Sequence, residues 1–83
     1  MATSTVAVKE SAVLIRCPNK SPLLAKLHTQ GQVFHIVEVS VRGGHKYALG
    51  VKRTAGYCWV INPTDKTTLW KTIKERWNVS IAN

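Results

Sequence analysis

Turn-forming residues interrupt this chain so often that short strands are the only regular elements that fit before position 62. Gly, Pro and Asn recur between short apolar runs. This punctuation is typical of strands joined by tight turns, and the Gly43-Gly44 pair supplies the positive φ of a hairpin. We predict strands over residues 6–8, 12–17, 23–28, 33–42, 47–51 and 57–61.

Side-chain alternation indicates which faces of these strands are buried. Val37, Val39 and Val41 alternate with polar residues, as on a half-buried strand. Segments 33–37 and 57–61 are instead apolar on both faces. We therefore expect another part of the chain to cover their second face.

The last segment has the pattern of an amphipathic helix. Asn62 is predicted as the N-cap, Pro63 as the first helical residue and Asp65 as an early anion favoured by the helix dipole. On a helical wheel four apolar side chains fall within an arc of about 100°: Leu69, Trp70, Ile73 and Trp77. The helix over residues 62–77 is expected to lie on the strands with both tryptophans inward. A short extended tail is expected near residues 79–81.

The charge of the chain points to anionic partners. Twelve Lys and Arg residues face four Asp and Glu residues, which gives a formal net charge of +8. Such an excess favours nucleic acid, an anionic polymer or an acidic protein surface, and it does not choose among them. The basic residues are spread along the chain, so any basic patch must be assembled by the fold.

Residues suited to catalysis or metal binding are few. Each carboxylate has a structural interpretation, such as helix capping or a solvent-facing strand position. Cys17 and Cys58 match no zinc or redox spacing. With no secretion signal and no disulfide framework, both thiols are expected to be reduced. Strand parity predicts that they point inward. We predict a protein that is not an enzyme and needs no metal or cofactor.

Four segments between residues 13 and 60 form a family-like series of motifs: Val13-Leu14-Ile15-Arg16-Cys17-Pro18, Leu24-Ala25-Lys26-Leu27-His28-Thr29-Gln30-Gly31, Lys46-Tyr47-Ala48-Leu49-Gly50-Val51 and Thr54-Ala55-Gly56-Tyr57-Cys58. In this order they resemble a bacterial Src-homology-3-like domain. The chain departs from the family pattern at Cys17-Pro18, where Ser-Gly is usual, and at Lys46, where an aromatic residue is usual. The resemblance implies a small antiparallel barrel of five to six strands, here with one C-terminal α-helix.

We therefore expect a single domain over residues 1–83. Residues 1–5 are expected to be frayed, residues 6–61 to form the β-barrel, residues 62–77 to form the helix packed on it and residues 78–83 to form a tail.

Two candidate binding surfaces follow. The resemblance implies a groove for a partner, lined by the aromatic residues Tyr47, Tyr57 and Trp59. The charge pattern predicts a basic face at two hairpins and along the helix. Its predicted members are Arg42, Lys46, Lys52, Arg53, Lys71 and Lys74.

The function predicted from these patterns is non-covalent docking to a protein or peptide, through the aromatic groove or the basic residues. A small basic domain of this kind fits an accessory protein of a phage or mobile element, in the cytoplasm or associated with a virion. No signal peptide and no membrane span are expected. A nucleic-acid-binding protein that uses the basic face is the main alternative. A structural subunit of a larger assembly is the third, and the sequence leaves the oligomeric state open.

Overall fold

The computed structural model describes residues 9–19 and 22–82 and is mainly β, as predicted. The described residues form six strands and one helix. In chain order these are β1 (Glu10–Arg16), β2 (Leu23–Thr29), β3 (Gln32–Val41), β4 (Gly44–Arg53), β5 (Gly56–Thr64), α1 (Lys66–Arg76) and β6 (Trp77–Ala82). The strand expected over residues 6–8 lies outside the described residues.

All six strands belong to one sheet in the order β5-β4-β3-β2-β1-β6. Strands β1 to β5 form an antiparallel meander, whereas β6 pairs with β1 in parallel after the crossover through α1. Gly43 has a φ of 90° between β3 and β4, so the hairpin predicted at the glycine pair is confirmed.

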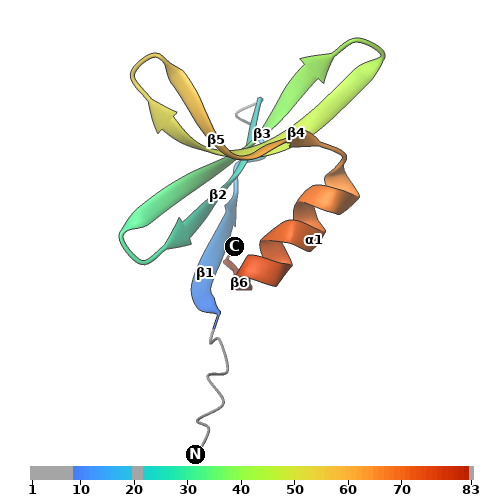
Figure 1. The fold of residues 1–83 in the computed structure, drawn as a ribbon. Coiled ribbons are helices and arrows are strands. Elements are labelled where there is room, and N and C mark those ends of the chain that lie inside the picture. Colours follow the sequence, from blue (N-terminus) through green and yellow to red (C-terminus); the bar gives the residue numbers. More distant parts are fainter. Residues whose placement is uncertain (1–8, 20–21, 83) are drawn as a thin grey trace, which may run out of the picture.

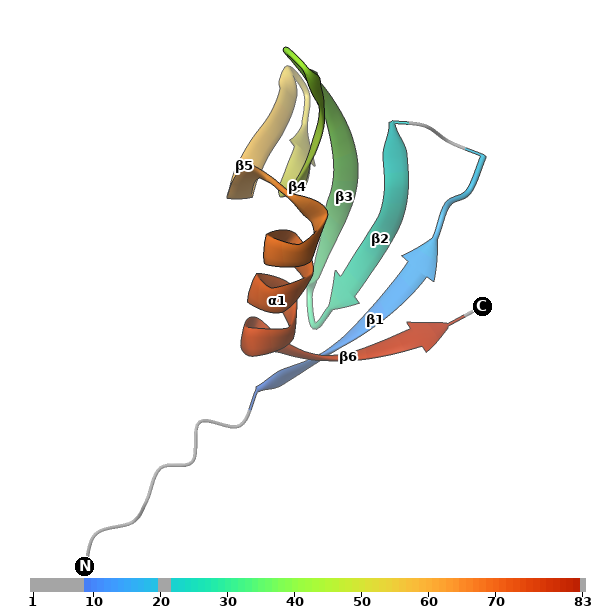
Figure 2. The ribbon, with the colours of Figure 1, turned by 90° about the vertical axis from the view of Figure 1, so that its right-hand side faces the viewer.

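The predicted closure into a barrel is wrong. Strands β5 and β6 are the two edges of the sheet, and no pairing joins them among the described residues. The sheet is strongly twisted, and α1 lies against one side of it (Figures 1 and 2). The physical reason is the crossover, because it brings the last strand to the outer edge of β1 rather than to β5.

The helix begins three residues later than predicted, and its N-cap is Asp65 rather than Asn62. The Asp65 carboxylate accepts a hydrogen bond of 2.9 Å from the Thr68 N–H and one of 2.7 Å from the Thr68 hydroxyl. Thr64 still pairs with Tyr47, so the preceding residues belong to β5. Pro63 is tolerated there because β5 is an edge strand, where one missing donor leaves no partner unsatisfied.

The expected extended tail is a complete strand. Residue Trp77 leaves the helix with extended backbone, and its N–H donates to the Ile73 carbonyl as the C-cap. From there β6 pairs with β1 from Glu10 opposite Trp77 to Ile15 opposite Ala82. Both tryptophans were predicted to point inward. Trp77 is buried, and Trp70 is half-buried against the same core.

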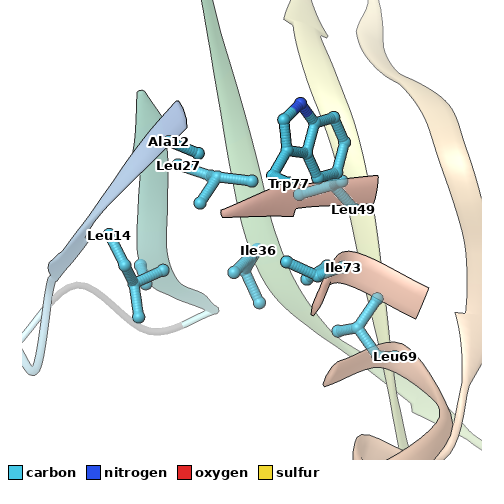
Figure 3. Packing of buried hydrophobic residues seen from close by; sticks show 9 residues of the cluster. Ala12, Leu14, Leu27, Ile36, Leu49, Leu69, Ile73 and Trp77 are labelled. Carbon is cyan, nitrogen blue, oxygen red and sulfur yellow. The ribbon is translucent and has the colours of Figure 1, made fainter. Parts of the chain in front are cut away.

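The core lies between α1 and the sheet (Figure 3). Alternate residues of the strands meet Leu69 and Ile73 of the helix, and the Phe34 and Trp77 rings pack with centroids 5.4 Å apart. The strands contribute Ala12, Leu14, Ala25, Leu27, Ile36 and Leu49. Among the described residues, no helix is long and apolar enough to cross a membrane.

Candidate functional site

The face of the sheet that is turned away from α1 has neither a helix nor a second sheet on it among the described residues, although two of its residues, Val37 and Ala48, are only 2% and 0% exposed. Successive strand residues point to opposite faces of a sheet. The residues on either side of each core residue in the sequence, and their register partners, therefore lie on the face away from α1. We call it the open face. By register it includes Val13, Ile15, Lys26, His28, Val33, His35, Val37, Val39, Lys46, Ala48, Gly50, Lys52, Tyr57 and Trp59. Val13, Ile15 and Val33 are 37–39% exposed, so the second apolar face expected to be covered is partly open to solvent.

One row of residues crosses the open face from β1 to β5. Ile15 pairs with Lys26, Lys26 with His35, His35 with Gly50 and Gly50 with Trp59. Register partners on neighbouring strands lie side by side on the same face. The row therefore places an apolar, a cationic, a titratable and an aromatic side chain along one line across the strands.

Two aromatic rings at the β5 end of this row are stacked. The Tyr57 and Trp59 rings are nearly parallel, with an interplanar angle of 7° and centroids 5.3 Å apart. The Lys52 ammonium lies 5.1 Å from the centroid of the Tyr57 ring, within cation–π range. Tyr57 and His35 also form a hydrogen bond of 3.1 Å between the hydroxyl and Nδ1. The phenol is thus fixed on three sides.

Gly50 provides the surface on which the Trp59 ring rests. A Cβ added at Gly50 would lie 2.6 Å from Cε3 of Trp59 and 3.1 Å from the Cys58 carbonyl oxygen. No side chain fits between the strand and the ring at such a distance. The indole therefore lies against bare backbone, which is the close approach that a glycine within a strand permits.

The open face carries cations and no carboxylate. By register, Glu10 lies on the side of Ala12 and Trp77, and Glu38 lies on the side of Tyr47. Asp65 and Glu75 belong to the cap and body of α1. All four acidic residues of the chain are thereby placed off this face.

The titration of His35 reflects the same surroundings. Partial burial lowers the pKa of His35 from its ordinary value of 6.5, and repulsion from Lys26, Lys52 and His28 lowers it further. A neutral imidazole is favoured, and in the tautomer that carries its proton on Nε2, Nδ1 accepts a hydrogen bond from the Tyr57 hydroxyl.

The structure brings together only part of each predicted surface. Tyr57 and Trp59 are neighbours on the open face, but Tyr47 lies on the opposite face, half-buried against the core. Lys46 and Lys52 share the open face with the two stacked rings. The other predicted cations lie elsewhere: Arg42 in the β3–β4 turn, Arg53 at the end of β4, and Lys71 and Lys74 on α1.

The sequence analysis did not identify Lys26, His28 and His35 as site residues. Their signal is present in the chain, since Lys26 and His28 alternate with the apolar Ala25 and Leu27. A two-residue turn at Gln30-Gly31 places Lys26 opposite His35, as the structure shows.

A groove of about 490 Å³ lies on the other side of the sheet, beside α1. Its walls are mainly apolar and come from β1, β2, β3, β4, α1 and β6. We call it the α1–β6 groove. It is lined by Leu14, Arg16, Pro18, Leu24, Ala25, Ile36, Tyr47, Lys66, Leu69, Trp70, Lys74 and Ile81.

The inward position predicted for both cysteines is wrong for Cys58. Cys58 is exposed. Cys17 is half-buried, and its thiol lies 3.8 Å from the Ile15 carbonyl oxygen. Cys58 is opposite Val51 in the sheet, and neither residue belongs to the core cluster under α1. Both thiols are free. The described residues contain no group of three or more His, Cys, Asp or Glu side chains arranged to hold a metal ion.

Comparisons of the chain with protein-family models, curated proteins and solved structures returned no match. The Src-homology-3-like resemblance therefore stays a prediction.

Proposed function

We propose that this protein is a non-enzymatic module that binds single-stranded nucleic acid on its open face. The observation that carries the proposal is the stacked Tyr57–Trp59 pair, on a surface that holds Lys26, Lys46 and Lys52 and no carboxylate. Each part of this surface corresponds to one part of a nucleotide.

The aromatic pair supports contact with bases. Every base has a π face, and stacking on an aromatic side chain contributes about 1–3 kcal/mol per base without reading the sequence. The Tyr57 ring is held in place by Lys52, Trp59 and His35. A fixed ring loses little conformational entropy when a base stacks on it.

The lysines support contact with the phosphate backbone. Lys46 and Lys52 lie on the same face of β4, and Lys26 lies two strands away. Phosphates neutralised by such side chains release counterions, so the affinity falls as salt is raised. A single strand fits this surface better than a duplex, because the π faces of paired bases are already stacked within the helix.

The proposal is tested by fluorescence anisotropy with labelled single-stranded and duplex DNA and RNA of mixed sequence. We expect the single strands to bind more tightly than the duplexes. Their affinity should fall steeply as salt is raised from about 50 to 300 mM. Lys52→Glu should weaken binding at least tenfold and make the salt dependence shallower by about one unit. Lys71→Glu makes the same change of charge on α1 and is the matched control.

Tyr57 separates stacking from charge. Tyr57→Phe keeps the ring and should keep most of the affinity, whereas Tyr57→Leu should weaken single-strand binding by roughly tenfold. The proposal fails if no strand binds at the lowest salt, if duplexes bind as well as single strands, or if Lys71→Glu has the effect of Lys52→Glu.

A further inference from the structure

We infer that the α1–β6 groove is a docking site for an extended, acidic and apolar peptide segment of a partner protein. The inference concerns the side of the sheet opposite the open face and does not depend on binding of nucleic acid. It also gives the protein partner expected from the sequence a specific surface.

The groove exists because α1 and β6 diverge. The helix ends at Arg76 and β6 begins at Trp77, and from there the two elements separate (Figure 2). The groove lies on the core side of the sheet, beside α1, and the core residues in its lining are at most 4% exposed. Leu14 of β1 and Leu69 of α1 border the groove with Ile36 between them (Figure 3). At about 490 Å³ the groove falls within the range of roughly 300–1,000 Å³ found for ligand pockets.

The lining combines an apolar wall with cations. The apolar surface open to an occupant comes from Leu24 and Trp70, which are half-buried, and from Ile81, which is 57% exposed. Arg16, Lys66 and Lys74 are the charged residues of the lining, and it includes no carboxylate. An occupant complementary to these residues has apolar side chains for the wall and negative charges for the cations.

The edge of the sheet favours a peptide over a small amphiphile. Strand β6 is the last strand of the sheet, so one row of its backbone donors and acceptors faces away from β1. Ile81 pairs with Leu14 and therefore points to the groove side of the sheet. A peptide strand added to β6 would direct alternate side chains to that same side. The backbone would supply affinity, and the groove would select apolar and acidic residues.

The test uses a blocked peptide of alternating leucine and glutamate, about nine residues long, which is a typical strand length. Peptides of the same length that alternate leucine with lysine, or serine with glutamate, are the controls. Binding is followed by backbone amide and indole shifts in ¹H–¹⁵N NMR spectra. We expect the leucine–glutamate peptide to shift signals of β6, the first half of α1 and the Trp70 indole, and both controls to bind at least tenfold more weakly.

Charge variants separate the two surfaces. The double variant Lys66→Glu with Lys74→Glu should weaken peptide binding at least tenfold. It should keep most of its affinity for single-stranded nucleic acid. Lys46→Glu with Lys52→Glu makes the same change of net charge on the open face and should do the reverse. Ile81→Asp changes an exposed side chain, so the fold should survive while peptide binding is lost.

Three outcomes overturn the inference. The first is the absence of peptide-induced shifts, or shifts confined to the open face. The second is concentration-dependent self-association in sedimentation that Ile81→Asp abolishes, which would make a second copy of the chain the occupant. The third is tighter binding of decanoate than of the peptide at the same residues, which would make the groove a site for anionic lipid.

Discussion

At the scale of single residues, the Gly50–Trp59 contact has the clearest consequence. The ring occupies the space that a Cβ would need, with 2.6 Å between the two positions. Overpacking of this kind costs about 1–3 kcal/mol in a well-packed site. We expect Gly50→Ala to lower the free energy of unfolding by that amount and to displace the indole.

A double-mutant cycle isolates the contact. In a Trp59→Ala background the ring is gone and only the Cys58 carbonyl oxygen remains close to the new methyl group. Gly50→Ala should therefore cost clearly less there than in the unmodified protein, as measured by urea denaturation. Equal costs in the two backgrounds would mean that the strand backbone, and not the indole, determines the effect.

His35 gives a second prediction at this scale, concerning pH. The pKa of His35 is lower in the folded protein than its ordinary value of 6.5, so the unfolded chain binds the proton more readily. The contribution of neutral His35 to the free energy of unfolding is present in full above pH 6.5. It is lost as the pH falls through 6.5 towards the lowered pKa. His35→Gln does not titrate, and its free energy of unfolding should fall less between about pH 8 and pH 5. Parallel curves for the two proteins would rule this out.

At the scale of elements, the start of α1 depends on one side chain. The Asp65 carboxylate accepts hydrogen bonds from the Thr68 N–H and the Thr68 hydroxyl. These hydrogen bonds lower the pKa of Asp65 below its ordinary value of 3.8. Asp65→Ala should lower the melting temperature at neutral pH, whereas Asp65→Asn should retain much of the cap. The difference between Asp65→Ala and the unmodified protein should shrink as the pH falls through the lowered pKa, because the protonated side chain loses its charge.

Asn62→Ala is the matched control for this prediction. Asn62 was predicted as the N-cap from its position before Pro63, yet it lies in β5. Its replacement should change thermal unfolding by circular dichroism less than Asp65→Ala does. The sequence pattern placed the helix but not its first residue, because the strand pairing of Thr64 with Tyr47 overrides the helix-start signal at Asn62-Pro63.

Strands were predictable because their signals are local. The β2–β3, β3–β4 and β4–β5 hairpins each have a two-residue turn, and the ends of β1 to β5 lie within three residues of the predicted ones. The faces were harder to assign, since they depend on the register across each turn. Arg53 pairs with Gly56, so the two-residue turn between them puts Tyr57 beside Lys52 and on the face opposite Tyr47. Grouping Tyr47 with Tyr57 ignored that register.

At the scale of the whole molecule, the sequence did not determine how the sheet ends. Antiparallel neighbours follow from chain order, but the partner of β6 lies 67 positions away, at Glu10 opposite Trp77. Nothing local distinguishes a tail that closes a barrel on β5 from one that extends the sheet beyond β1. Both candidate surfaces depend on this point. The α1–β6 groove opens only because β6 joins β1, and the open face is uncovered because α1 lies on the other side.

The parallel pairing of β1 and β6 also governs how the molecule responds to a pulling force. Glu10 starts β1 and Ala82 ends β6, and in register these residues lie at opposite ends of the pair, roughly 17 Å apart along the strands. A load applied between them slides one strand along the other. Every hydrogen bond of that ladder is then strained at the same time, whereas a load across a hairpin would open its bonds one after another. The same strand pair that leaves the sheet open therefore makes it resistant to tension along the chain.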